Sequence, residues 1–454
     1  YQKMTDRQTL ESLAADLATG RTTALTLAEA ALARAQDAAG EGARVFTHLS
    51  RERALAAARA SDTLRAAGIV RSPLEGIPVS VKDLFDVAGE VTTAGSAVLR
   101  DAPPAVRNAP VIDRLIAAGA VIVGRTNMSE FAFSGLGLNP HWGTPANPWD
   151  RAGRRIPGGS SSGAAVSVTD GMAAVAIGSD TGGSVRIPSA LCGLTGFKPT
   201  QRRVPIDGAL PLSSSLDSIG PLGASVRCCA ITDAVLAGQP VPESGTRDWP
   251  GARLAVPETL VLDGMDAPVA SAFERALARL AAAGARITRL AVPEFAQFAA
   301  LNARGTLAAA EAWAWHRALL ARHEAAYDPR VSSRIRGGEK MGAADYIDLL
   351  AARRRWIAQV ERRIAGYDAL VLPTVPIVAP RIADLQASDA AYFAANGLIL
   401  RNPTLINFLD GCALSLPCHG AGEAPVGLML AGAGGADAKV LALGQAVERA
   451  LAAA

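Results

Sequence analysis

The sequence predicts an α/β fold, because short apolar segments of strand type are separated by helical segments over most of the chain. Between residues 76 and 200 these segments alternate with loops rich in glycine, serine and proline, and beyond residue 250 they alternate with long helices. Strands separated in this way indicate a largely buried sheet. The expected strands are 77–81, 120–123, 173–177, 254–256, 370–372 and 426–430.

The expected helices have apolar residues at helical spacing. Residues 20–23, Gly-Arg-Thr-Thr, separate the first two. The expected helices are 7–18, 25–37, 50–67, 269–283, 306–323, 343–364 and 437–452.

The chain has 454 residues, of which 50% are hydrophobic, so it is long enough for a large core. Length alone would suggest two or three domains, but no linker or repeat divides the sequence. We therefore expect a single domain over residues 4–454, with residues 1–3 a cloning remnant before a natural start at Met4.

The composition argues against several classes of protein. Lys and Arg number 45 against 42 Asp and Glu, a near balance that does not indicate binding to nucleic acid or to a membrane surface. No run reaches the ~18 apolar residues of a membrane span. The five cysteines form no CxxC pair, which indicates reduced thiols in a cytoplasmic protein. The sequence contains no HExxH motif and no other ligand cluster, so we expect neither a metal nor a cofactor.

Two segments rich in glycine and serine are the strongest sign of chemistry. Residues 157–163 read Pro-Gly-Gly-Ser-Ser-Ser-Gly, and residues 179–189 read Ser-Asp-Thr-Gly-Gly-Ser-Val-Arg-Ile-Pro-Ser. Consecutive backbone N–H groups ahead of a serine can form a nest that stabilises an oxyanion. The residues that supply such a run are Thr181, Gly182, Gly183 and Ser184.

A serine nucleophile needs a base, and Lys82 is the better candidate because the five histidines are scattered. In the strand that leads to it, Ile77, Val79 and Val81 share one face, which places Ser80 and Lys82 on the other. Burial would lower the pKa of Lys82 and let it act as a neutral base. On the strand pattern alone, a lysine that reaches solvent or pairs with Asp83 is the commoner outcome.

Further segments carry a resemblance that covers nearly the whole chain. Together with the two serine segments, and in this order, they resemble the amidase-signature family. The resemblance implies a large central mixed β-sheet covered by helices on both faces. The segments are 73–83, 124–132, 197–200, 217–222, 367–374 and 416–428.

The resemblance also implies roles for single residues. Lys82 would be the base, Ser160 a relay serine that follows a cis peptide, and Ser184 the nucleophile. The oxyanion hole would fall on the backbone of residues 181–184. Ser162 stands where the commonest form of the family has glycine, which adds a hydroxyl near the relay. The residues expected to bind substrate are Met128, Phe131, Phe133, Trp142, Gly158 and Gly159.

The implied activity is hydrolysis of a small-molecule amide, aryl amide, carbamate or urea through an acyl-enzyme. The alternative is a glutamine-hydrolysing subunit of a tRNA-dependent amidotransferase, and a catalytically inactive binding protein is a third class. The loop 131–143 is apolar and aromatic where glutamine would want polar groups, which favours the first class. A homodimer is expected on frequency alone.

Other interpretations of the same residues lead elsewhere. Residues 159–163 also fit G-x-S-x-G, which would make Ser161 the nucleophile and His316 or His419 its base, but no apolar strand precedes the motif. No Gly-Lys-Ser/Thr ending supports a phosphate loop. Asp180 and Arg186 are expected to form an ion pair that shapes the nucleophile loop. Alternatively, Arg186 binds a substrate carboxylate.

Overall fold

The computed structural model describes residues 8–243 and 251–452, so the expected remnant at residues 1–3 and Met4 lies outside the described residues. Within the described part, eleven strands form one mixed sheet in the order β1-β3-β2-β4-β6-β5-β10-β11-β9-β7-β8. All six predicted strands belong to it. The strands are β1 Phe46–Leu49, β2 Pro78–Lys82, β3 Val121–Thr126, β4 Val175–Asp180, β5 Thr195–Lys198, β6 Ser218–Gly223, β7 Arg253–Pro257, β8 Arg286–Leu290, β9 Ala369–Pro373, β10 Cys412–Pro417 and β11 Gly427–Gly432.

The predicted helices are present, most of them within one to three residues of the expected bounds. The first begins at Leu10, because the hydroxyl of Thr9 caps it by accepting from the Ser12 N–H. The helices are α1 Leu10–Ala18, α2 Ala24–Gln36, α3 Gly42–Val45, α4 Arg51–Ala66, α5 Pro110–Ala117, α6 Ser162–Thr169, α7 Arg186–Cys192, α8 Val226–Ala237, α9 Ala267–Ala282, α10 Pro293–Leu301, α11 Leu307–His323, α12 Pro329–Arg336, α13 Ala343–Ile364, α14 Ile382–Ala387, α15 Asp389–Phe408 and α16 Asp437–Ala452.

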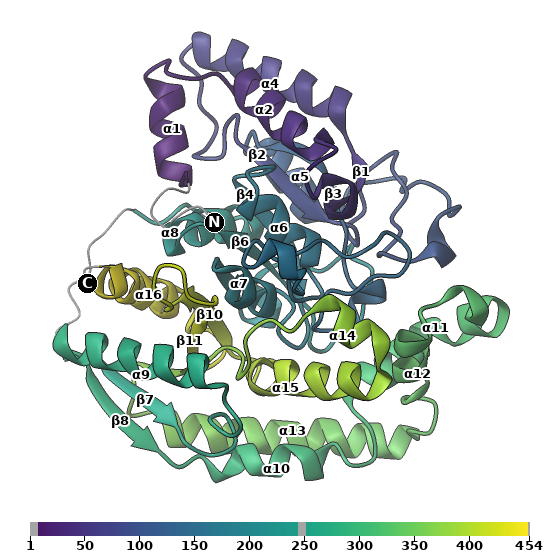
Figure 1. Ribbon diagram of the computed structural model, residues 1–454, viewed down its shortest axis with the longest axis vertical. Coiled ribbons are helices and arrows are strands. Elements are labelled where there is room, and N and C mark those ends of the chain that lie inside the picture. The colour runs from purple at the N-terminus through teal and green to yellow at the C-terminus, as the bar shows by residue number, and fades with distance from the viewer. Residues whose placement is uncertain (1–7, 244–250, 453–454) are drawn as a thin grey trace.

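Helices cover both faces of the sheet, as expected. Leu254 of β7 and Val371 of β9 pack with α8, α9 and α16 on one face. Their neighbours Ala255 and Leu370 pack with α10, α13 and α15 on the other. The split follows the alternation of side chains along a strand. In Figure 1, α9 lies beside β7 and β8, while α13 and α10 run along the bottom of the molecule.

The centre of the sheet sets the position of the site. β2 runs parallel to both β3 and β4, and β4 pairs antiparallel with β6. Val79 and Val81 of β2 enter a hydrophobic cluster. Ser80 faces the opposite way, toward α6, where its hydroxyl lies 2.8 Å from that of Ser167. The predicted division of β2 into an apolar and a polar face is therefore confirmed.

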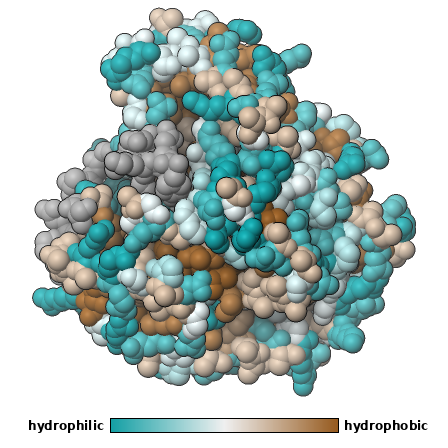
Figure 2. All heavy atoms as spheres, in the orientation of Figure 1, coloured by the Kyte–Doolittle hydropathy of each residue, from teal (hydrophilic) through white to brown (hydrophobic). Residues whose placement is uncertain are grey.

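Three further observations concern the surface, the cysteines and the helices. On the face in Figure 2, hydrophilic side chains cover much of the surface, and strongly hydrophobic ones gather mainly near the middle of the lower half. All five cysteines are buried, and no disulfide joins them. Over residues 8–243 and 251–452, no helix combines the length and the apolar character that crossing a bilayer requires.

Candidate active site

Lys82 ends strand β2 and its side chain is fully buried. Its Nζ lies 2.7 Å from Ser160 Oγ and 2.9 Å from Ser179 Oγ. The two alternatives for this lysine are therefore excluded. It does not reach solvent, and the carboxylate of Asp83 is instead paired with Arg125, whose Nε lies 2.7 Å from Asp83 Oδ1.

Burial lowers the pKa of Lys82 to about 7, because removing the ammonium from water costs more than the attraction of Asp180 and Asp217 returns. A large fraction of Lys82 is consequently an uncharged amine near neutral pH. Such an amine can accept a proton from Ser160 Oγ while its own N–H groups donate to Ser179.

Ser160 lies in the tight turn that leads into α6. The Gly159–Ser160 peptide bond is cis, as the resemblance implied. The carbonyl of Ser160 accepts from the Ser129 N–H at 3.0 Å. A Cβ at position 159 would lie 2.5 Å from the Gly137 nitrogen, so only glycine lets the two chains approach this closely. The turn thereby fixes the Ser160 side chain beside Lys82.

Ser184 follows the loop that leaves β4, the strand adjacent to β2. Its carbonyl accepts from the Ser161 N–H at 3.3 Å, which ties it to the turn that carries Ser160. The Ser184 side chain is buried at 3% exposure, yet it lines a cavity. The structure thus brings all three residues of the predicted triad to one place, two of them joined directly through their side chains.

Asp180 organises the loop between β4 and Ser184. Its carboxylate accepts from the N–H groups of Gly183 and Val185 at 2.8 and 3.1 Å. It also pairs with Arg186, whose Nη2 lies 2.9 Å from Asp180 Oδ1 with both side chains fully buried. The attraction of Arg186 holds the pKa of Asp180 well below its usual range, although burial opposes this. The predicted ion pair is confirmed.

The guanidinium of Arg186 has further partners that occupy it. Its Nη2 lies 2.6 Å from Asn407 Oδ1 and 3.2 Å from the Pro403 carbonyl. Because the group is fully buried and its charge is already neutralised by Asp180, the alternative role as a carboxylate-binding residue finds no support in the structure.

The backbone around Ser184 supplies N–H groups that face different partners. Gly183 has a φ of +122°, and a Cβ there would lie 2.6 Å from both Ile187 and Pro403, so the position needs glycine. Its N–H already donates to Asp180.

The hydroxyl of Thr181 donates to Asp217, whose carboxylate also accepts from the Ser213 N–H. Burial raises the pKa of Asp217 to about 7, and the hydrogen bonds oppose this.

The cavity beside Ser184 has a volume of about 340 Å³ and a mostly apolar lining. Among the described residues that line it, Arg334 is the only charged one. Elements far apart in the sequence meet here, since the lining comes from the loops after β3, β4 and β5 and from α10, α11, α12 and α15. The lining residues are Ala132, Phe133, Ser134, Thr181, Gly182, Ser184, Leu212, Leu216, Phe298, Asn302, Thr306, Leu307, Ala308, Ala309, Arg334, Leu400, Thr404 and Phe408.

The six residues expected to bind substrate are spread over several environments. Phe133 lines the cavity. Phe131 packs in an aromatic cluster, with its ring centroid 4.4 Å from that of His316. Trp142 lines a different hollow, where Arg100 lies 5.0 Å from its ring centroid. Met128, Gly158 and Gly159 are buried, and none of them lines the cavity. A direct role in substrate binding stays a prediction for all six.

The G-x-S-x-G interpretation does not fit the structure. Loop, not strand, precedes Ser161, and the Ser161 hydroxyl donates to the Ser179 carbonyl at 3.4 Å. His316 lies in the aromatic cluster, with Nδ1 3.0 Å from the Tyr327 hydroxyl, and burial lowers its pKa to about 3. His419 contacts the backbone of Val426.

Three residues of the site were not singled out from the sequence. Ser179 lies in the second serine segment, and its place near the end of a strand beside β2 could have indicated contact with Lys82. Asp217 lies in segment 217–222, which carries the family resemblance but does not by itself indicate contact with Thr181. Arg334 lies on α12, a helix that the sequence analysis did not predict, so nothing in the local pattern marked it.

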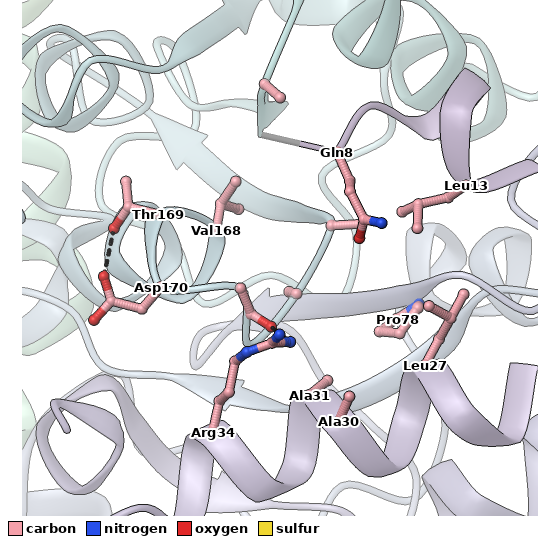
Figure 3. A pocket seen from close by; sticks show the side chains of 14 residues that line it. Gln8, Leu13, Leu27, Ala30, Ala31, Arg34, Pro78, Val168, Thr169 and Asp170 are labelled. Carbon is pink, nitrogen blue, oxygen red and sulfur yellow. Dashed lines mark hydrogen bonds between the residues drawn. The ribbon is translucent and has the colours of Figure 1, made fainter. Parts of the chain in front are cut away.

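A second hollow, shown in Figure 3, has a volume of about 460 Å³ and lies between α1, α2 and the end of α6. Its charged groups are engaged with the protein itself. Arg34 Nη1 donates to the Gly171 carbonyl at 3.1 Å, and Asp170 pairs with Arg151 at 2.8 Å. Thr169 donates to Asp170, as the dashed line shows. We therefore place the candidate site in the cavity beside Ser184.

Across the described part of the chain, no group of three or more His, Cys, Asp or Glu side chains is arranged to hold a metal ion.

Comparison with known proteins gives a consistent result. The sequence model of the Amidase family matches residues 26–441. A 2-amino-5-chloromuconic acid deaminase of Comamonas testosteroni is 39% identical over 401 residues, covering 87% of this chain and 86% of that protein. A glutamyl-tRNA(Gln) amidotransferase subunit of Chloroflexus aggregans is 36% identical, covering 95% and 94%. The crystal structure of an amidase superposes with a TM-score of 0.87 at 35% identity, covering 97% and 99%.

Proposed function

The chain belongs to the amidase family and is a hydrolase of carbon–nitrogen bonds other than peptide bonds, and from this we propose that Ser184 is its nucleophile, Ser160 its relay and Lys82 its base. The observation that carries the proposal is the 2.7 Å contact between Lys82 Nζ and Ser160 Oγ, made by a fully buried lysine whose pKa is lowered to about 7. A base that is partly neutral at physiological pH is what a serine nucleophile requires.

Each proton in the proposed reaction has a defined path. Lys82 takes a proton from Ser160 as Ser160 takes one from Ser184, whose oxygen attacks the substrate carbonyl. The resulting oxyanion is stabilised by backbone N–H groups of the loop that ends at Ser184. We assign this role to Thr181, Gly182 and Ser184, because the N–H of Gly183 donates to Asp180. Ser160 then returns a proton to the leaving nitrogen, and water hydrolyses the acyl-enzyme.

The cavity supports a substrate with an apolar portion. Phe133, Leu212, Leu307 and Phe408 line it beside Ser184, and its volume of about 340 Å³ suits a small amide. We therefore propose small amides and aryl amides as substrates, with carbamates and ureas as further candidates. We also propose a cytoplasmic location and a homodimer.

The second candidate is a glutamine-hydrolysing subunit of a tRNA-dependent amidotransferase. One relative, 36% identical over 468 residues, is named as a subunit of a glutamyl-tRNA(Gln) amidotransferase. The α-ammonium group of a glutamine bound in this cavity would need an acidic partner, and none of the described lining residues is acidic. This favours the stand-alone amidase.

The test is turnover of a panel of anilides, alkyl amides, carbamates, ureas and glutamine by the wild type and by Ser184→Ala. We expect turnover of amides that falls by at least about a hundredfold in the variant. Mass spectrometry of a slowly deacylated ester should show the acyl group on the peptide that contains Ser184. A smaller loss, or acylation elsewhere, contradicts the assigned nucleophile, and turnover of glutamine alone favours the second candidate.

A further inference from the structure

Arg334 lies on α12 and lines the same cavity as Ser184. It is the one charged side chain among the described lining residues. The remaining lining is chiefly aliphatic and aromatic, as at Phe133, Leu212 and Phe408. A single cation in such surroundings is costly unless a partner neutralises it, because apolar walls cannot replace the water it has lost.

The protein itself supplies little that would neutralise Arg334. Its Nη1 donates to the Phe133 carbonyl at 2.6 Å, and its guanidinium carbon lies 4.4 Å from the Phe133 ring centroid. Within residues 8–243 and 251–452, no Asp or Glu carboxylate pairs with it. Burial lowers the pKa of Arg334, which is opposed only by Tyr392.

Two fully buried arginines of this protein, unlike Arg334, each have a carboxylate partner. Arg125 pairs with Asp83 at 2.7 Å and Arg186 pairs with Asp180 at 2.9 Å. Those two guanidinium groups are structural, since their charge is neutralised within the fold. Arg334 is partly exposed to a cavity and lacks such a partner, which is the arrangement expected of a group that awaits an anion.

A second feature of the cavity also favours an anion. Four lining residues, 306–309, form the N-terminus of α11, a helix of 17 residues. The Thr306 hydroxyl caps this end by accepting from the Ala309 N–H at 3.1 Å. The N-terminal end of a helix carries a partial positive charge. Arg334 and α11 therefore present positive potential from two different elements to one cavity.

We propose that Arg334 binds a carboxylate of the substrate, so that the enzyme selects amides whose apolar body carries a carboxylate group. The proposal rests on the proposed function, because it assumes that the scissile amide lies at Ser184. The planar guanidinium can bind a carboxylate through two parallel hydrogen bonds, while the apolar lining contacts the carbon chain between the two groups. Since the described lining holds no acidic side chain, a free amino acid would leave its ammonium group without a partner.

The test uses two matched series of p-nitroanilides, made from dicarboxylic acids from succinic to suberic. One series ends in a carboxylate and the other in the neutral carboxamide of the same length. Binding of both series to Ser184→Ala is measured by calorimetry, which needs no turnover. Hydrolysis of both series is measured with the wild-type enzyme. We expect the best carboxylate to bind at least about 30-fold tighter than its carboxamide, with a matching preference in kcat/KM.

Variants of α12 assign the preference to Arg334. Arg334→Met should abolish the preference for the carboxylate, and Arg334→Lys should restore part of it through charge alone. Arg336→Met is the matched control on the same helix, because Arg336 pairs with Glu324 at 2.6 Å instead of lining the cavity. It should leave the preference unchanged. Melting temperatures show whether each variant is folded.

The outcomes separate this proposal from the proposed function. Equal binding of carboxylate and carboxamide at every length, or a preference that survives in folded Arg334→Met, overturns the role of Arg334 even when hydrolysis depends on Ser184. Preferential binding of carboxylates that is lost in Arg334→Met supports the role even when p-nitroanilides are not hydrolysed. Failure of hydrolysis to depend on Ser184 counts against the proposed function alone.

Discussion

Asp217 accepts a hydrogen bond from the hydroxyl of Thr181, the residue at the start of the loop that ends at Ser184. The same carboxylate accepts from the N–H groups of Leu212 and Ser213. It therefore ties together two segments that both line the cavity, since Thr181 and Leu212 are lining residues. When ionised, above its own pKa of about 7, Asp217 also attracts the Lys82 ammonium and so raises the pKa of Lys82.

Removing that charge should change the pH dependence of the enzyme. In Asp217→Asn the pKa of Lys82 should fall, because the attraction that favours the ammonium is lost. The upper part of the acidic limb of kcat/KM, at and above about pH 7 where wild-type Asp217 is ionised, should consequently move to lower pH. The measurement is a pH profile beside that of Asp207→Asn, an exposed aspartate in a nearby loop that should leave the limb in place. A limb that moves to higher pH contradicts the assignment of Lys82 as the base.

The wild type should gain activity as the pH rises through about 7. The proposed base, Lys82, can act only when neutral, and burial lowers its pKa from 10.5 to about 7, so the protonated form, which cannot accept a proton, dominates below that pH. The expected profile of kcat/KM rises about tenfold per pH unit on the acidic side and levels off above neutrality. A lysine with an ordinary pKa would keep the activity rising toward pH 10. An optimum near pH 5 with a fall above it rules out a lysine base.

Lys82→Arg should be as damaging as Lys82→Ala, although it preserves the positive charge. A guanidinium is not deprotonated in proteins, so it cannot accept a proton from Ser160. We expect both variants to lose at least about a thousandfold in kcat. Lys439→Ala is the control, because Lys439 is half-exposed and pairs with Asp368 at 2.9 Å. Substantial activity in Lys82→Arg would show that the lysine acts through charge and not as a base.

Asp180→Asn should destabilise the fold as well as impair catalysis. The substitution leaves the buried Arg186 guanidinium without its counter-charge, which typically costs about 3–5 kcal/mol. The free energy of unfolding is measured by urea denaturation. The exposed pair of Arg275 and Glu423 gives the comparison, since Arg275→Met should cost less than about 1 kcal/mol. Similar costs for the two variants contradict the structural role of the Asp180–Arg186 pair.

The sequence predicted the strands, the long helices and the covered sheet because apolar spacing reports burial directly. The alternation along β2 correctly placed Lys82 opposite Val81, and the dense glycines of the serine segments marked the tight turns. The pattern around Lys82 did not exclude a solvent-exposed lysine, because the burial of that side chain depends on α6 and β4, which lie about 80 to 100 residues further along the chain.

The composition of the cavity was the least predictable part. Its lining combines β-strand loops with α10, α11, α12 and α15, whose proximity is a product of the tertiary fold. Aromatic residues near the serine segments were therefore a poor guide: Phe133 lines the cavity, whereas Phe131, two residues earlier, turns into a cluster with His316. Arg186 was considered for carboxylate binding because it adjoins Ser184 in the sequence. Only the structure separates it from Arg334, which lies about 150 positions later.

The alternating faces of β2 link correct folding to reactivity. If β2 slipped by one residue against β3 and β4, Lys82 would turn into the hydrophobic cluster that now holds Val79 and Val81, and the serines would face an aliphatic side chain. A chain with that error would still carry Lys82, Ser160 and Ser184, and on the proposed mechanism it would be inactive. Titration of Ser184 with a serine-reactive probe would therefore measure the fraction of molecules in which β2 has the correct register against β3 and β4. Optical measures of secondary structure do not report this fraction.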